Sequence, residues 1–162
     1  LIIGWNSGED SLISARSPKP EERSQFTDRV FGAPARWVAA RTAPGKPAWL
    51  YHFSYVATRM RPAVTTAAHA AEIPYVWEYW GRRTPMSVVS EEDKALAALM
   101  HACWVSFAKT SVPRCGEVPW PAYDPARDPL MEFGAQSGVR TRFRKAEFDA
   151  LEASVLPTLG LP

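Results

Sequence analysis

The sequence lacks any uninterrupted apolar run of about 18 or more residues, so we expect none of its segments to span a membrane. It also lacks an excess of either charge: 19 Lys and Arg oppose 17 Asp and Glu, and the net charge of +2 gives no drive toward nucleic acid. No internal repeat occurs, and no spacing of Cys and His is typical of a zinc site. We therefore expect no membrane span, no nucleic-acid partner and no metal.

Cysteine and histidine are scarce, with two and three residues. Cys103 falls on an apolar helical stripe, whereas Cys115 lies in a loop, so we expect two unrelated free thiols and leave a disulfide open. His101 and Cys103 are two positions apart on the same predicted helix. They point in different directions and do not make a metal pair.

The composition is that of a globular protein, with 46% hydrophobic residues in 162. Residues 1–162 are long enough to bury one core, so we expect a single domain. Proline is frequent, at 15 residues, which indicates many loops and turns held by a rigid framework.

The order of predicted elements alternates between strands and helices, which is typical of an α/β sheet. The apolar and aromatic residues 48–56 predict a strand buried on both faces. Ser90 and Asp93 form a capping-box-like start for a long helix. Other expected elements are a strand over residues 1–5, a surface loop over 14–24, a helical turn capped by Thr27, a helix from Pro34 to Arg41, a hairpin of 130–133 with 139–143, and a helix over 145–155.

Two sets of side chains are expected to share a face. Arg140, Arg142 and Arg144 alternate with other residues, which predicts one solvated strand face. Helical spacing predicts a buried face on the long helix, made of Leu96, Met100, Cys103, Trp104 and Phe107.

His69 lies among small residues, in the run Ala-Ala-His-Ala-Ala-Glu-Ile-Pro-Tyr-Val-Trp that begins at Ala67. An imidazole titrates near neutral pH, and alanines on both sides let another catalytic group approach it. We therefore expect acid-base chemistry at His69. His52, inside the predicted strand, and His101, on the predicted helix, are expected to be structural.

The His69 run resembles the histidine loop of the type-B carboxylesterases, a branch of the α/β-hydrolases, with its small-His-x-x-Glu-Ile/Leu-x-Tyr/Phe-Val pattern. Three other blocks are similar to family segments in the same order, so the resemblance covers nearly the whole chain. They are residues 2–13, residues 27–36, and residues 104–110 with 119–124. The resemblance implies a mostly parallel sheet flanked by helices, and hydrolysis of small-molecule carboxylic esters through an acyl-enzyme, without a cofactor.

The resemblance also implies a Ser-His-Glu triad in which His69 is the base and Glu9 the acid. The family has Asp-Glu-Gly-Ser at the acid, whereas this chain has Gly-Glu-Asp-Ser from Gly8. Asp10 can accept the same hydrogen bond, so Glu9 and Asp10 stay alternatives. Glu72 either supports the triad or pairs locally with Arg82 or Arg83. Three aromatic residues after the histidine loop are expected to fill the core rather than line a substrate pocket; they are Trp77, Tyr79 and Trp80.

No Gly-x-Ser-x-Gly nucleophile elbow occurs in the sequence. The chain also opens on the apolar residues 1–4, as if midway through a strand. We therefore expect the C-terminal part of an α/β-hydrolase fold, incomplete and inactive without an upstream segment that carries the serine. Alternatives are a non-catalytic cholinesterase-like module for binding or adhesion, or a hydrolase of amide, carbamate or lactone bonds. The compartment is left open.

Overall fold

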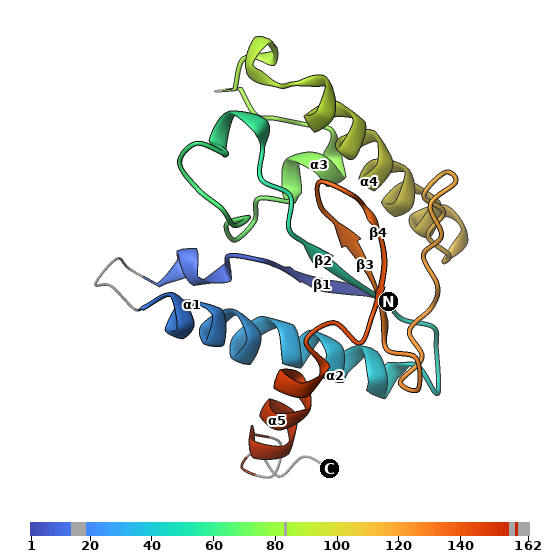
Figure 1. Ribbon diagram of the computed structural model, residues 1–162. Helices are drawn as coiled ribbons and strands as arrows, with labels where there is room; N and C mark the ends of the chain where they lie inside the picture. The colour runs from blue at the N-terminus through green and yellow to red at the C-terminus, as the bar shows by residue number, and fades with distance from the viewer. Residues whose placement is uncertain (14–18, 83, 156–157, 159–162) are drawn as a thin grey trace.

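The structure, a computed structural model, describes residues 1–13, 19–82, 84–155 and 158. Its centre is a sheet in which the strand order follows the chain order (Figure 1). The strands β1 (Ile2–Asn6), β2 (Trp49–Phe53) and β3 (Pro129–Phe133) are parallel, and β4 (Gly138–Thr141) returns antiparallel to β3. The predicted mostly parallel sheet flanked by helices is confirmed.

Helices cover both faces of this sheet (Figure 1). One side has α1 (Pro20–Thr27), the π-helical turn η2 (Asp28–Gly32), α2 (Ala33–Thr42) and α5 (Lys145–Val155), and the other has α3 (Ile73–Trp77) and α4 (Glu91–Thr110). Three short 3-10 turns complete the elements: η1 (Glu9–Leu12), η3 (Thr58–Met60) and η4 (Met86–Val88).

The strand β2 joins the two halves of the core, because its side chains alternate between the faces of the sheet. Trp49 and Phe53 pack in the cluster under α3 and α4, together with Met100 of α4. Leu50 packs in the other cluster, with Ala39 of α2. Burial on both faces explains the nearly continuous apolar sequence of this strand.

The capping box predicted at Ser90 is confirmed. Ser90 is the N-cap of α4; its hydroxyl accepts a bond of 3.0 Å from the Asp93 amide, and the Asp93 carboxylate accepts from the Ser90 amide at 3.0 Å. Asp93 also accepts hydrogen bonds from the hydroxyl groups of Tyr55 and Tyr75. Burial raises the pKa of Asp93, but hydrogen bonds from Ser90 and Thr58 outweigh it and lower the pKa to about 2.

Residues 14–24 were expected to be a surface loop, and this is wrong for the part from Pro20 onward, where α1 begins. Pro20 is at the first helical position, where its missing N–H costs nothing, and the Glu22 carboxylate accepts a bond of 3.1 Å from the Lys19 amide. Residues 14–18 lie outside the described residues. Thr27 caps no turn, because the backbone passes through it in helical conformation into η2.

The expected pair of free thiols is wrong. Cys103 of α4 and Cys115 form a disulfide, with their Cα atoms 4.5 Å apart. The chain leaves α4 through Ser111, whose φ of 61° reverses its direction, and returns Cys115 to the buried face of the helix. A sequence separation of 12 residues hid this contact, because it depends on how the loop turns.

We expect the double variant Cys103→Ala and Cys115→Ala to lower the free energy of unfolding by about 3 kcal/mol, because the bridge restricts the unfolded chain. Urea unfolding of the oxidised full-length protein measures this. Wild-type protein in reductant is the matched control and should lose a similar amount. A loss below about 1 kcal/mol in both would contradict a stabilising bridge.

The predicted solvated face of three arginines is only partly correct. The strand β4 ends at Thr141, so only Arg140 is part of it. Arg144 has a φ of 49° and turns back to α1 and η2, where it forms an ion pair of 2.7 Å with Asp28 and donates to the Ser24 hydroxyl at 2.8 Å. This arginine therefore ties the segment before α5 to the helical layer.

Candidate active site

Two loops meet where β1 and β2 end. Because these strands are parallel, the segments that follow them leave at the same edge of the sheet. The Gly8 amide donates to the Ala67 carbonyl at 2.7 Å, and the Ala67 amide donates to the Ser7 hydroxyl at 2.8 Å. A Cβ on Gly8 would lie 2.6 Å from the Thr66 hydroxyl oxygen, so only glycine allows the loops to approach this closely.

The two loops bring Glu9 and His69 together, as the sequence predicted. Glu9 Oε2 lies 2.5 Å from His69 Nδ1, and Glu9 Oε1 accepts a bond of 2.7 Å from the Asn6 amide. The glutamate is 3% exposed, whereas the imidazole side chain is 44% exposed. Because Glu9 lies against Nδ1, Nε2 is the ring nitrogen on the exposed side of the imidazole that is left for another group.

Contacts of its backbone and of the imidazole ring hold the histidine loop in place. The His69 amide donates to the Ser11 hydroxyl at 2.8 Å, and the next residue, Ala70, has a φ of 63°. The imidazole ring also lies against Phe31, with the ring centres 5.7 Å apart. These contacts limit how far the ring can turn away from Glu9.

Asp10, the other candidate partner of His69, points elsewhere. Its carboxylate pairs with Arg23 of α1 at 3.1 Å. Glu9 and Asp10 are neighbours in η1, so the turn separates their directions. Among the described residues, Glu9 is the only carboxylate that accepts a hydrogen bond from the His69 ring.

Asn6 is a part of this site that the sequence analysis missed. The side chain is 1% exposed, and its amide nitrogen donates to the Ala68 carbonyl at 2.7 Å and to Glu72 Oε2 at 2.5 Å. Glu72 is thereby joined to the loop of Glu9 rather than to Arg82; Arg83 lies outside the described residues. A polar residue at the carboxyl end of a buried parallel strand was the available signal.

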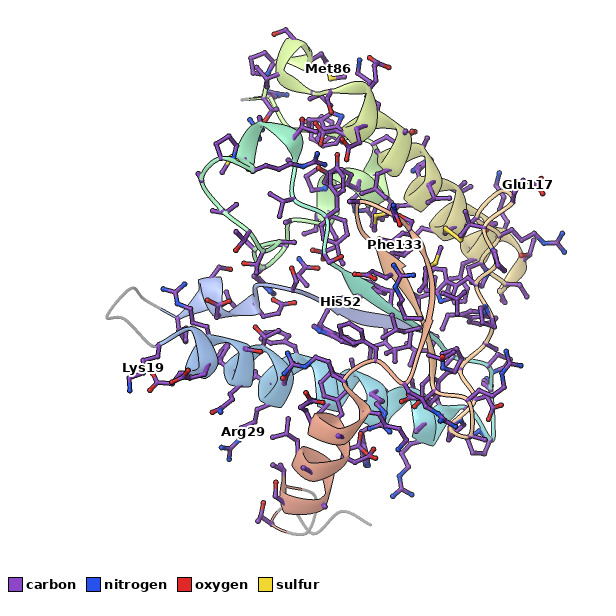
Figure 2. The ribbon with its side chains drawn as sticks, viewed as in Figure 1. Lys19, Arg29, His52, Met86, Glu117 and Phe133 are labelled. Atoms are coloured by element: carbon purple, nitrogen blue, oxygen red, sulfur yellow. A yellow bond between two sulfur atoms is a disulfide. The ribbon has the colours of Figure 1, made fainter. Side chains whose placement is uncertain are left out.

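The other two histidines have separate surroundings. His52 is buried in β2 between Trp5 and Phe143, with ring centres 5.0 and 4.8 Å away (Figure 2). Burial lowers the pKa of His52 to about 4, so the ring is neutral near pH 7. His101 Nδ1 donates to the Val76 carbonyl at 2.9 Å. Neither ring contacts Glu9.

Two of the three aromatic residues expected in the core are at the surface instead. Trp77 is 66% exposed and Tyr79 is 62% exposed. Trp80 packs edge-to-face on Tyr75, with ring centres 4.9 Å apart, and lines a cavity beside the histidine loop. Glu78, the residue after α3, has a φ of 48°, which carries the chain outward.

The described residues lack two kinds of feature. None of their helices is long and apolar enough to cross a membrane. They also contain no group of three or more His, Cys, Asp or Glu side chains arranged to hold a metal ion.

Known proteins resemble this chain in sequence and in fold. Para-nitrobenzyl esterase of Bacillus subtilis (strain 168) is 32% identical over 100 residues, which cover 60% of this chain and 20% of that protein. Fumonisin B1 esterase of Sphingopyxis macrogoltabida is 34% identical over 141 residues, covering 83% and 25%. The chain spans a quarter or less of the length of these curated relatives.

A solved structure of a PNB esterase matches the fold, with a TM-score of 0.78 at 20% identity over 93% of this chain and 37% of that chain. This likeness shows that the sheet and its helices have the α/β-hydrolase arrangement. The model of the carboxylesterase family matches residues 8–151, which include both Glu9 and His69. The chain therefore belongs to the carboxylesterase family.

Proposed function

We propose that this chain is the C-terminal part of a serine esterase, which hydrolyses carboxylic esters and to which it contributes Glu9 as the acid and His69 as the base. The observation that carries the proposal is the hydrogen bond between Glu9 Oε2 and His69 Nδ1, combined with the exposure of the imidazole. Membership of the carboxylesterase family supports the reaction class.

In this mechanism His69 Nε2 takes the proton of the serine hydroxyl as the oxygen attacks the ester carbonyl. The imidazolium formed at that moment is stabilised by the buried carboxylate of Glu9, which also keeps the ring in the required tautomer. The same imidazolium then protonates the leaving alcohol, and water hydrolyses the acyl-enzyme with His69 again as base. The chemistry needs no cofactor.

The serine and the oxyanion hole are assigned to an upstream segment of the same protein. Residues 1–162 have no Gly-x-Ser-x-Gly sequence, and β1 is at the end of the sheet order, paired with β2 alone among the described strands. An apolar edge strand of a parallel sheet is open to pairing with a further strand. A strand beside β1 would end at the same edge as Glu9 and His69.

The acid and base determine the reaction type, whereas the bond that is cleaved depends on the pocket. The relatives include proteins named para-nitrobenzyl esterase and fumonisin B1 esterase. A triad of this kind also serves hydrolases of amides, carbamates and lactones, because substrate choice depends on the pocket. We propose a carboxylic ester as the substrate, and a panel of the four bond types tests it.

A fluorophosphonate probe tests the proposal, since it labels only activated serines. We expect denaturing mass spectrometry of the treated full-length protein to show one adduct, on a serine outside residues 1–162. The variant His69→Ala should label far more slowly. Failure of wild-type protein to label, or an adduct on a serine within residues 1–162, would overturn the proposal; the first result would favour a non-catalytic binding protein.

A further inference from the structure

A cavity of about 430 Å³ lies between the loop after β2 and the helices α3 and α4. Its volume is within the roughly 300–1,000 Å³ of small-molecule sites. Its walls include Ser11, which holds the backbone of His69, and Ala68 and Ala71 on either side of His69. The cavity therefore adjoins the proposed active site.

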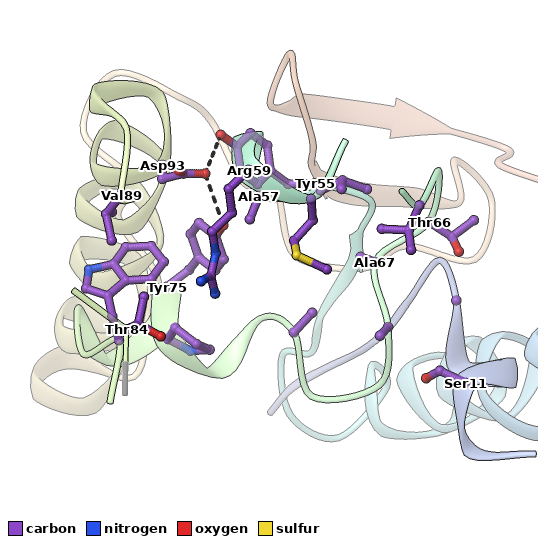
Figure 3. Close-up of a pocket in the computed structure, with 18 of the residues that line it drawn as sticks. Ser11, Tyr55, Ala57, Arg59, Thr66, Ala67, Tyr75, Thr84, Val89 and Asp93 are labelled. Atoms are coloured by element: carbon purple, nitrogen blue, oxygen red, sulfur yellow. Dashed lines mark hydrogen bonds between the residues drawn. The ribbon is translucent and has the colours of Figure 1, made fainter. Parts of the chain in front are cut away.

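The walls of this cavity are mainly apolar and aromatic. Tyr75 and Val89 line one side and Ala67 lines the other (Figure 3). Trp80 and Met60 also line the cavity. Tyr75 and Trp80 are held edge-to-face, which makes a rigid surface for an apolar group. These walls suit the hydrocarbon or aromatic body of a ligand.

Asp93 also lines the cavity, but it does not offer its charge to a ligand. Its carboxylate accepts from the Tyr55 hydroxyl at 2.9 Å and from the Tyr75 hydroxyl at 3.3 Å (Figure 3). It also accepts from the Thr58 hydroxyl at 2.9 Å, besides the capping bonds of Ser90. The carboxylate is therefore already saturated with donors, and it fixes the wall rather than binding a cation.

Arg59 is the charged group that is available in the cavity. Figure 3 shows its side chain passing Tyr75, with the guanidinium group in the open space between the walls. Burial raises the pKa of Tyr75, and the nearby charge of Arg59 opposes that rise. Within the described part of the chain, Arg59 has no hydrogen bond and no ion pair, whereas Arg23, at the rim, pairs with Asp10.

We propose that this cavity binds an organic carboxylate with an apolar body, whose carboxylate pairs with Arg59 while its body packs on Tyr75 and Trp80. An arginine in a mainly apolar pocket favours an anionic group, because the guanidinium matches a carboxylate with two parallel hydrogen bonds. The inference rests on the proposed function, which supplies the ligand. The ligand is either the carboxylate-bearing part of an ester substrate or the free acid that hydrolysis releases.

The substrate source is tested by kinetics of the full-length enzyme on two esters of equal chain length. The 4-nitrophenyl monoester of adipic acid carries a free carboxylate, and 4-nitrophenyl hexanoate does not. We expect Arg59→Gln to raise KM for the adipate ester about tenfold, the effect of one charge-assisted hydrogen bond. The kcat values and the KM for hexanoate should stay unchanged.

Arg61→Gln is the matched control, because Arg61 is an exposed arginine two positions later that is already paired with Glu92. It should alter neither KM.

The free-acid source is tested by calorimetry, with 4-phenylbutyrate and the neutral 4-phenylbutanol as probes. We expect Arg59→Gln, but not Arg61→Gln, to weaken phenylbutyrate binding about tenfold and to leave phenylbutanol binding unchanged.

The outcomes separate the two proposals. Loss of selectivity for the adipate ester in Arg59→Gln supports a substrate carboxylate, and Arg59-dependent binding of phenylbutyrate without that loss supports the product acid. If Arg59→Gln behaves as Arg61→Gln in both measurements, the carboxylate site is overturned while ester hydrolysis stands. If neither ester is hydrolysed but phenylbutyrate binding still requires Arg59, the site stands and the esterase proposal fails.

Discussion

His69→Ala is expected to lower kcat for ester hydrolysis in the full-length enzyme by about four orders of magnitude or more, with little change in the free energy of unfolding. In the proposed triad, the imidazole is the group that takes the serine proton, while Glu9 holds its other ring nitrogen. Its side chain is substantially exposed, so its removal takes little packing from the core. Steady-state turnover assays measure kcat, and urea unfolding of the same preparation measures the free energy of unfolding.

The neighbouring carboxylates provide a matched comparison for this result. Glu9→Gln should lower kcat by about 10⁴-fold, because an amide cannot hold the required tautomer or stabilise the imidazolium. Asp10→Asn should leave kcat within about threefold, since Asp10 pairs with Arg23 rather than with His69. Near-normal turnover in His69→Ala would remove the assignment of the base, and the reverse order of the two carboxylates would make Asp10 the acid.

Arg36→Met is expected to lower the free energy of unfolding by about 3 to 5 kcal/mol. Arg36 of α2 is buried and forms ion pairs of 3.1 Å with Asp128, 2.7 Å with Asp149 and 3.1 Å with Glu152. The last two partners belong to α5, so this guanidinium joins α2 to α5. Its loss leaves the buried carboxylate of Asp128 without its cation.

Arg29→Met is the control for this substitution. Arg29 is exposed on η2 and points to solvent (Figure 2), so it should change the free energy of unfolding by less than about 0.5 kcal/mol. The double variant Arg36→Met with Asp128→Asn should recover part of the loss, because the uncompensated charge is then removed. Equal unfolding midpoints for Arg36→Met and the wild type in urea would show that the buried pairs add nothing.

Local patterns predicted the parts of the fold whose determinants lie close together in the chain. The strand β2 was visible because a strand buried on both faces needs apolar residues throughout. The start of α4 was visible because a capping box uses residues three positions apart, Ser90 and Asp93. The helix α1 was not, because its residues are charged and contribute little to the core; Pro20 and Glu22 were the local signals that the sequence analysis missed.

In the candidate site too, local patterns predicted some residues, and other contacts depended on the tertiary structure. His69, with its alanines and Glu72, forms a continuous pattern, and Glu9 lies in a second one, so both residues were named from the sequence. The choice between Glu9 and Asp10 as neighbour of the imidazole needed the direction of the η1 turn. The role of Asn6 as the link between Glu9 and Glu72 needed β1 and β2 side by side.

The sequence by itself determined the α/β layering, the main helix and strand positions and His69 as the histidine of the pair, because these depend on periodicity, caps and short motifs. Only the tertiary structure decided the disulfide of Cys103 with Cys115, the return of Arg144 to Asp28 and the place of Arg59 in a cavity. These contacts form between segments whose relative positions depend on the direction of the loops. Residues in the left-handed backbone conformation, such as Ser111, set that direction, and they adopt this conformation only in the folded chain.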